Sequence, residues 1–213
     1  MTKIGVIGSG QVGQALARGF KQHGYDVRIA SRSPEKLSQF SSAEKIPTGT
    51  FSDVAQWADT IVLAVLGRAA EEALQEAGAS NLSGKVVIDA TNPIDAVPPE
   101  DGVLRFFTGP NESLMERLQA KVPDARFVKA FSCVGNARMV DPQFESGKPS
   151  MFYCGDDAEA KKEVATLLRE FGWEPVDMGT AKGARAIEPL AQLWCIPGFL
   201  RNEWTHAFRM LMR

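Results

Sequence analysis

A glycine-rich hexad near the start of the chain is the first group of residues whose spacing could do chemistry. Gly8, Gly10 and Gly13 follow the apolar run at 3–7 and open a helical stretch. In that context the first glycine permits a tight turn, the second lets the backbone approach a pyrophosphate, and the third lets helix and strand pack closely. The helix N-terminus offers free N–H groups to phosphates. The predicted dinucleotide-binding loop contains Gly8, Ser9, Gly10, Gln11, Val12 and Gly13.

A second diagnostic position lies at the end of the second expected strand. A site for NAD presents a carboxylate there to the ribose 2′-hydroxyl, whereas this chain has Ser31, Arg32 and Ser33. The guanidinium, the two hydroxyls and Lys36 in the next helix match a 2′-phosphate, which a carboxylate would repel. We therefore predict NADP(H) as the cofactor. The alternative is a solvated Arg32 and a Ser33 that merely caps the helix opened by Pro34.

Two further segments leave the carboxyl edge of the expected sheet and should pass near the nicotinamide half of the cofactor. One is the turn at 64–66, and the other is the sequence Thr-Asn-Pro at 91–93. A loop-capping role is the alternative for the second segment. The cofactor contacts predicted here are Ala64, Val65, Leu66, Thr91, Asn92 and Pro93, of which Asn92 and Pro93 would line the nicotinamide pocket.

The sequence names no catalytic residue. Structural roles are expected for both histidines, His23 near a helix end and His206 on a C-terminal apolar stripe. The three cysteines lack the spacing of a metal site, and Cys133 is expected to be a packed thiol. The residues assemble neither a Ser/His/Asp set nor a pair of carboxylates. This pattern favours a hydride transfer that needs orientation more than proton transfer.

The elements that must position these residues follow a βαβ rhythm, because short β-branched runs alternate with helical stretches. The rhythm predicts an α/β chain with a Rossmann-type, doubly wound, mainly parallel sheet. In the first half, strands are expected at 3–7, 26–30, 60–65 and 86–89, and helices at 12–23, 34–40, 53–58 and 69–77.

The second half is expected to extend this sheet after a long functional loop at 91–110. We predict one NADP-binding domain over 1–213, with a dinucleotide-binding core at 1–110 and a C-terminal extension at 111–213 that carries the redox pocket. Strands are expected at 126–130, 150–154 and 174–176, and helices at 113–120 and 158–171, the latter capped by Asp156 or Asp157.

The final stretch, 183–213, is expected to be mostly helical and broken at Pro197-Gly198. Leu200, Trp204, Phe208 and Leu211 then recur at helical spacing and form an apolar stripe. The stripe could pack on the chain's own sheet or form a subunit interface. We predict a weakly held homodimer.

Composition limits the class of protein. The 213 residues carry a formal net charge of −2 and show no run of Lys or Arg, so nucleic acid is not expected as a partner. The N-terminus does not resemble a secretory leader, and the longest apolar run is about a third of the length that a membrane-spanning helix needs. A cytoplasmic protein without a membrane segment, with reduced thiols, is expected.

Five sequence motifs together carry a resemblance to a known family. They are Gly8-Ser-Gly-Gln-Val-Gly13, Ser31-Arg-Ser33, Val128-Lys-Ala-Phe131, Cys154-Gly-Asp-Asp157 and Ala184-Arg-Ala-Ile-Glu-Pro-Leu190. They resemble the deazaflavin (coenzyme F420)-dependent NADP reductases over nearly the whole chain. They are also similar to the cytosolic NADPH domain of the six-transmembrane metalloreductases.

The resemblance implies a Rossmann core with a small C-terminal portion, in which a flat redox partner stacks over the nicotinamide and takes hydride directly. It implies that Ser9, Ser31, Arg32 and Lys36 hold the NADP phosphates, and that 91–93 and 132–135 border the redox pocket. The segment Cys133-Val-Gly-Asn136 differs from the amino-acid sequence that the family resemblance leads us to expect around a deazaflavin.

We therefore predict an NADP(H)-dependent oxidoreductase, a reductase that passes hydride to a small-molecule acceptor of deazaflavin, flavin or quinone type. One alternative is a reductase of small imines similar to the pyrroline carboxylate reductases, although the chain lacks room for their long helical dimer domain. The other is a non-catalytic NADP-binding sensor or docking domain.

Overall fold

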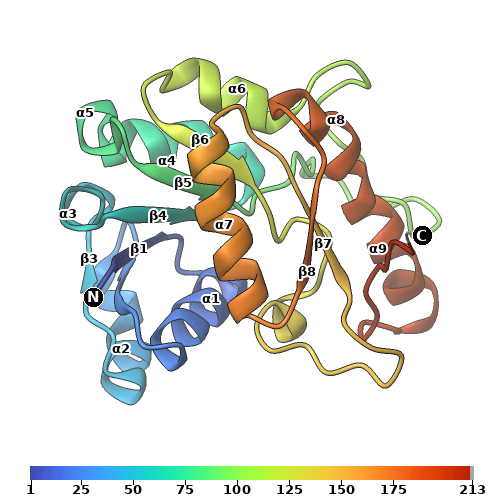
Figure 1. Cartoon of the computed structure of the whole chain (residues 1–213), viewed down its shortest axis with the longest axis horizontal. Helices are drawn as coiled ribbons and strands as arrows, with labels where there is room; N and C mark the ends of the chain where they lie inside the picture. The colour runs from blue at the N-terminus through green and yellow to red at the C-terminus, as the bar shows by residue number, and fades with distance from the viewer. Residues whose placement is uncertain (212–213) are drawn as a thin grey trace.

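The computed structural model describes residues 1–211, and its centre is a six-stranded parallel sheet in the order β3-β2-β1-β4-β5-β6 (Figure 1). The central strands are short apolar runs that are buried on both faces, as expected of a parallel sheet covered by helices. The strands are β1 (Lys3–Ile7), β2 (Asp26–Ala30), β3 (Thr48–Gly49), β4 (Thr60–Leu63), β5 (Val86–Asp89) and β6 (Arg126–Lys129).

The strand order reverses between β1 and β4. From β1 the chain moves outward to β2 and β3, and then returns to place β4 on the other side of β1, with Ile7 paired to Leu63. In open α/β sheets the crevice at the carboxyl ends of such a strand pair is where ligands bind. The Rossmann-type fold predicted from the sequence is therefore confirmed, and the glycine hexad lies at its switch point.

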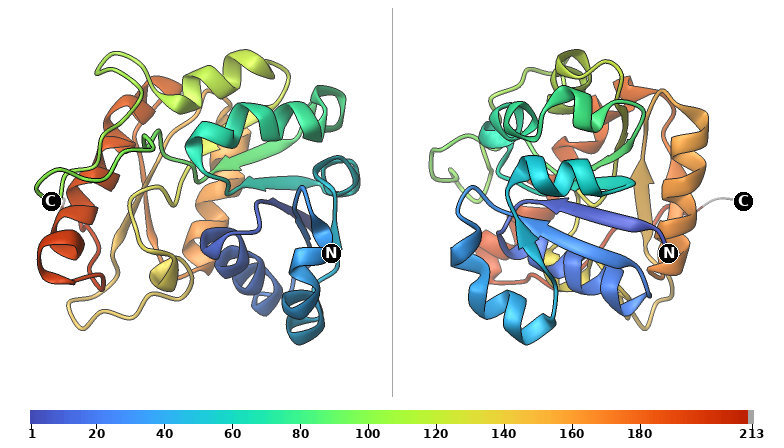
Figure 2. Two further views of the ribbon diagram at one scale, coloured as in Figure 1. Left: turned by 180° about the vertical axis from the view of Figure 1, so that it is seen from behind. Right: turned by 90° about the vertical axis from the view of Figure 1, so that its left-hand side faces the viewer.

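Helices cover both faces of this sheet. Helix α7 lies in front of the sheet in Figure 1, and α4 lies on the far side, seen from behind in Figure 2. No helix in the part of the chain from 1 to 211 is long and apolar enough to cross a membrane. The α-helices are α1 (Gln11–Gln22), α2 (Ser38–Glu44), α3 (Phe51–Trp57), α4 (Ala70–Ala77), α5 (Ala79–Leu82), α6 (Leu114–Lys121), α7 (Ala158–Glu170), α8 (Ala184–Ile187) and α9 (Pro189–Arg201).

Side-chain caps fix where several helices begin. Ser113 accepts a hydrogen bond from the backbone N–H of Glu116 while the Glu116 carboxylate accepts from Ser113, which is a capping box at the start of α6. Asp157, one of the two expected caps, accepts from the Ala160 N–H at the start of α7. These local bonds are why the sequence located both helices to within a residue.

Other boundaries differ from the predicted ones. The helix expected at 34–40 begins as a 3-10 turn, Pro34–Leu37, and continues as α2 to Glu44. The strand expected at 60–65 ends at Leu63, because the chain turns there into the crevice. Strand β3 and helix α5 were not predicted, since segments of two and four residues are too short to show a hydrophobic period.

The last two strands form a sheet of their own, which corrects the expectation that they extend the main one. β7 (Ser150–Tyr153) and β8 (Glu174–Asp177) pair in parallel, and a single antiparallel bridge between Lys129 and Cys154 joins them to β6. The other edge of β7 is covered by the C-terminal segment, where Ser150 donates its N–H to the Phe208 carbonyl at 2.9 Å. Strand β8 therefore covers one edge of β7, and the C-terminal segment covers the other.

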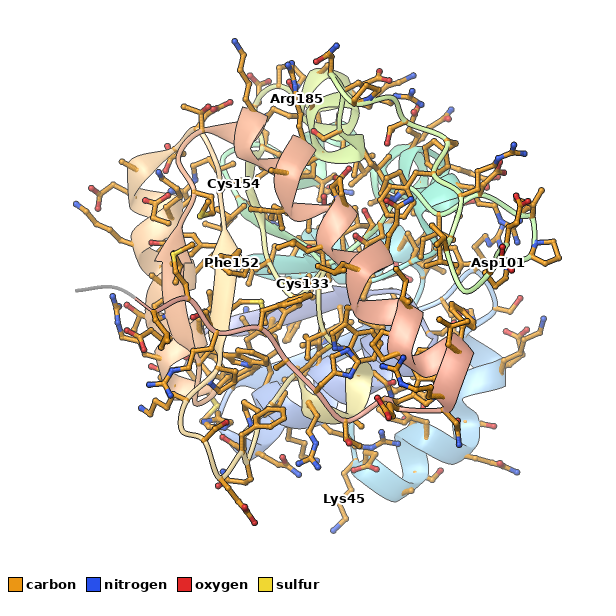
Figure 3. All side chains as sticks on the ribbon, turned by 90° about the vertical axis from the view of Figure 1, so that its right-hand side faces the viewer. Lys45, Asp101, Cys133, Phe152, Cys154 and Arg185 are labelled. Carbon is orange, nitrogen blue, oxygen red and sulfur yellow. The ribbon has the colours of Figure 1, made fainter. Side chains whose placement is uncertain are left out.

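The C-terminal stripe expected at Leu200, Trp204, Phe208 and Leu211 does not exist, because the helix ends at Arg201. Helix α9 runs through Pro197 and Gly198, where a break was predicted, and stops as Asn202 adopts a left-handed conformation with φ 56°. The chain then folds back, and the Trp204 ring packs so close to Gly198 that a Cβ there would lie 2.3 Å from it. Figure 3 views this side of the molecule, with α9 running diagonally in front.

A buried charge cluster joins the main sheet to the C-terminal helices. Lys129 on β6 is fully buried, and its Nζ lies 2.8 Å from Asp89 Oδ2 on the neighbouring strand and 2.9 Å from Glu188 Oε1 at the start of α9. The same Nζ donates to the Thr91 carbonyl at 2.6 Å. Burial by itself would lower the pKa of Lys129, but the two carboxylates outweigh burial and raise it, so the lysine stays charged.

The carboxylates of this cluster are satisfied as well. Glu188 accepts the backbone N–H groups of Leu114 and Met115 at 2.9 and 3.0 Å, at the N-terminus of α6, where the helix dipole favours a negative charge. Next to it, Arg185 donates to both oxygens of Glu116. The motif Ala184-Arg-Ala-Ile-Glu therefore fastens α8 and α9 to α6.

Replacing Lys129 by Met should lower the free energy of unfolding by about 3–5 kcal/mol, because it leaves two buried carboxylates without their cation. Urea denaturation followed by circular dichroism measures this. Lys162→Met is the matched control, since Lys162 pairs with Glu159 on the exposed face of α7, and it should change the value by about 0.5 kcal/mol or less. If the two substitutions lowered the free energy of unfolding equally, the buried charge cluster would not be what holds the C-terminal helices to the sheet.

Candidate functional site

A cleft of about 990 Å³ opens at the carboxyl edge of the sheet, over the switch point between β1 and β4. It brings together segments that follow β1, β2, β4 and β5. The predicted site residues that line it are Gly8, Ser9, Gly10, Gln11, Val12, Ser31, Arg32, Ser33, Lys36, Ala64, Val65, Leu66, Thr91 and Asn92. Gly13 and Pro93 were also predicted, and they lie outside the lining.

Each of the three positions in the hexad requires glycine for a different structural reason. Gly8 has φ 133°, and a Cβ on it would lie 2.2 Å from the Ala64 carbonyl oxygen. A Cβ on Gly13 would lie 1.9 Å from the Gly8 carbonyl oxygen, so Gly13 serves the packing of α1 on β1 and lies outside the cleft for that reason. A Cβ on Gly10 would meet no protein atom within 4 Å. Gly10 therefore leaves a surface open toward the cleft, as a close-lying pyrophosphate requires.

The N-terminus of α1 faces the same loop. Gly10 is its N-cap and supplies no side-chain acceptor to the first backbone N–H groups. The Gln14 side chain donates to the Ser9 carbonyl at 2.9 Å and holds the loop in place. The free N–H groups and the helix dipole together form an anion site at this end of α1.

The Ser31-Arg-Ser33 segment, which follows β2, lines the cleft. Ser31 is buried, and its Oγ accepts the Ser33 N–H at 3.1 Å. Ser33 makes no side-chain cap to the 3-10 turn that follows it, so the structure does not support the alternative of a simple helix cap. Arg32 is exposed and lies 3.5 Å from Glu72 of α4. Since exposed pairs of this kind contribute little, the guanidinium can bind an anion.

Several residues that line the cleft were not predicted from the sequence. Phe51 of α3 and Glu72 and Glu76 of α4 also line the cleft, and residues 94–98 continue its wall beyond Asn92. No periodicity or motif marks them. The long loop at 91–110 was the available signal, since loops of that length after a strand often border a site.

The segment after β5, which lines the cleft at Thr91 and Asn92, is held from both sides. Thr91 donates its N–H and its hydroxyl to Asp89 Oδ1 at 2.9 and 2.6 Å, and its carbonyl accepts from Lys129. The backbone at Gly67 packs so closely that a Cβ there would lie 1.9 Å from the Asn92 carbonyl oxygen. Asn92 Nδ2 donates to the Ser132 carbonyl at 2.7 Å. This wall is rigid.

The residues at 132–135, which the resemblance places at the redox pocket, lie behind this wall and do not line the cleft. Ser132 and Cys133 are buried, and Gly135 packs on the ring of Trp194. Burial raises the pKa of the Cys133 thiol to about 12. The expectation of a packed thiol is confirmed.

The histidines lie outside the cleft lining. His23 Nε2 lies 3.1 Å from the Asp141 carboxylate, and its ring packs on Phe171. His206 stacks on Trp194, whose indole N–H donates to the His206 carbonyl at 2.8 Å. Both side chains have structural partners. Residues 1–211 contain no group of three His, Cys, Asp or Glu side chains that could hold a metal ion.

Comparison with known proteins supports the family suggested by the sequence motifs. The profile of the family described as NADP oxidoreductase coenzyme F420-dependent matches residues 3–93. A crystal structure from Arthrobacter sp. FB24, provisionally described as an F420-dependent NADP reductase, is 32% identical, covers 100% of both chains and superposes with a TM-score of 0.93. This chain belongs to that family. The expected membership, the NADP cofactor and the reductase class are thereby confirmed.

More distant relatives are longer than this chain. Metalloreductase STEAP3 of Rattus norvegicus is 29% identical over 203 residues, which are 93% of this chain and 39% of the relative. Metalloreductase STEAP2 of Homo sapiens is 29% identical over 188 residues, 88% of this chain and 35% of the relative. The chain spans well under half of either. The imine reductase of Streptomyces aurantiacus, 18% identical with a TM-score of 0.68, shares the fold.

Arg32→Ala should weaken NADPH binding about tenfold or more and leave NADH binding unchanged, because the 2′-phosphate is the group that meets the guanidinium. Fluorescence titration with both nucleotides measures this. Arg201→Ala, at the end of α9 and paired with Glu203, should change neither affinity. Equal NADPH and NADH affinities in the unmutated chain would rule out a 2′-phosphate site at Arg32.

Proposed function

We propose that this member of the F420-dependent NADP oxidoreductase family is an NADPH-dependent reductase that passes hydride directly to a flat acceptor of deazaflavin, flavin or quinone type. The observation that carries the proposal is the cleft itself. It joins an open glycine loop, an end where Arg32 and Lys36 offer two cations beside Glu72 and Glu76, and an end at Thr91 and Asn92 that is held by hydrogen bonds and has no acid/base pair among its described lining residues. Such a site orients two rings and needs no proton transfer from the protein.

The residues present fit NADP(H). The open surface at Gly10 and the N–H groups of α1 would hold the pyrophosphate. Ser31, Arg32, Ser33 and Lys36 would hold the 2′-phosphate, with Arg32 supplying a planar donor pair that matches phosphate oxygens. The carboxylate of Glu72 is separated from Arg32 by 3.5 Å, so it can orient the guanidinium without neutralising it fully.

The nicotinamide, when bound, supplies or accepts the hydride. The protein's contribution is orientation and exclusion of water. Ala64, Val65 and Leu66 would lie along one side of the ring and Thr91 and Asn92 along the other, and Pro93 would support this wall from behind. Because the Thr91 hydroxyl is already donated to Asp89, Thr91 is not poised to deliver a proton to a bound substrate. Direct transfer between two rings at close distance is the chemistry that remains.

The division of the chain, its cellular location and its oligomeric state are also proposals. We propose that residues 1–213 act as one NADP-binding unit, with the cofactor core at 1–110 and the acceptor side in 111–213. We also propose that the chain works in the cytoplasm as a weakly held homodimer. In place of the predicted stripe, α9 carries three exposed apolar side chains, Leu193, Phe199 and Leu200, which a dimer would cover.

Mixing the purified protein with NADPH and, separately, a deazaflavin, FMN, FAD and a short-chain quinone tests the reaction. We expect loss of absorbance at the reduced nicotinamide band with one acceptor, because the cleft orients a flat ring against the nicotinamide. Arg32→Ala in the same assay should raise the KM for NADPH with little change in kcat. Tight NADPH binding without turnover on any acceptor would favour the sensor alternative, and turnover of a small cyclic imine would favour the imine reductase.

Leu200→Glu should shift the homodimer toward monomer, since it places a charge on the exposed apolar face of α9. Sedimentation velocity at micromolar concentration measures this, with Lys162→Met on α7 as a variant that should keep the dimer. A monomer at every concentration of the unmutated chain would remove the dimer proposal.

A further inference from the structure

The side chain of Asn92 has one polar atom that is hydrogen-bonded and one that is not. Its Nδ2 donates to the Ser132 carbonyl at 2.7 Å. Its Oδ1 is buried and accepts a hydrogen bond from none of the described residues, and the hydroxyl oxygen of Ser132, whose carbonyl Asn92 contacts, is also buried and unpaired. Buried polar atoms in folded proteins are nearly always paired, so an orphaned acceptor in the wall of a cleft indicates a partner from outside the chain.

The orientation of this amide is fixed by chemistry. The Ser132 carbonyl can only accept, so the amide nitrogen must face it, and a flipped amide would oppose two oxygens. Ser132 is itself held in place, because the buried Phe131 before it adopts φ 62°. A bulky residue keeps that conformation only when the surrounding packing imposes it. Asn92 Oδ1 is therefore a positioned acceptor and not a rotating one.

The backbone of Asn92 is fixed as well. Its carbonyl accepts the Ile94 N–H at 2.8 Å and lies against the backbone of Gly67. The preceding residue, Thr91, is anchored by Asp89 and by the buried Lys129. The segments after β4 and β6 thus both contact this one residue, Gly67 at its backbone carbonyl and Ser132 at its side chain. Such convergence is what precise recognition of a ligand group requires.

We propose, on the basis of the function proposed above, that Asn92 Oδ1 accepts a hydrogen bond from the carboxamide NH2 of the nicotinamide. It thereby selects a pyridine-3-carboxamide and sets how the ring lies in the cleft. The other polar side chain of the same segment, Thr91, has its hydroxyl donated to Asp89. Asn92 Oδ1 exposes less than 1 Å², so its approach by the carboxamide requires the side chains that cover it to move aside while the hydrogen-bonded backbone of the wall stays in place.

The test compares the equilibrium binding of NADP⁺ with that of its 3-acetylpyridine analogue, in which a methyl group replaces the NH2. The unmutated chain should bind NADP⁺ about three- to tenfold more tightly, the range expected for one neutral hydrogen bond. Asn92→Leu, which is similar in size and has no acceptor, and Asn92→Ala should bind both nucleotides with equal affinity. Isothermal titration calorimetry without any redox acceptor gives these values.

Asn111→Ala is the matched control, since Asn111 is exposed in the loop before α6, and it should keep the unmutated preference. Thermal melting checks that each variant is folded. If Asn92→Ala does not fold, Asn92→Leu is the variant that tests the inference. An unchanged preference in the folded Asn92 variants overturns the inference, as does equal binding of both nucleotides by the unmutated chain. Failure of the unmutated chain to bind NADP⁺ at all overturns the proposed function, and this inference with it.

Discussion

The ammonium group of Lys129 is fully buried, and the arrangement of the site depends on how its charge is balanced. Asp89 and Glu188 lie within hydrogen-bond distance of it, one from the neighbouring strand and one from the junction of α8 and α9. An isolated charge in such a place would be prohibitively unfavourable. Because each partner comes from a different element, the sheet, the loop after β5 and the C-terminal helices must assemble together for the charge to be tolerated.

This arrangement connects stability with function. Lys129 also holds the Thr91 carbonyl, so the cation that fastens the C-terminal helices also fixes the wall of the cleft. Glu188 carries the link onward to the N-terminus of α6. Buried ion pairs contribute little net stability compared with apolar residues of the same size, but they specify geometry. Here the geometry they specify is that of the cleft wall at Thr91 and Asn92.

The relatives show how widely this scaffold is used. A family of F420-dependent NADP oxidoreductases, two metalloreductases and an imine reductase share it to different degrees. The glycine loop and the switch point are features of the fold, whereas the chemistry depends on what meets the nicotinamide. In this chain the cleft wall after β4 and β5 includes Ala64, Val65, Leu66, Thr91, Asn92 and Asp95, and under the proposed function it positions two rings.

The sequence by itself determined five of the six strands of the main sheet, the glycine loop and the segment at 31–36, because each depends on local spacing: apolar runs, a strand followed by glycines, and polar residues directly after a strand. It also placed Asn92 at the cleft, since a residue just after a parallel strand must lie at that edge. Tertiary structure alone decided the rest. The course of the chain after Arg201 follows from Trp204 packing on Gly198, and the unpaired oxygen of Asn92 follows from Ser132, forty residues away. Such contacts join residues that no local pattern relates, so they are decided only when the chain is packed.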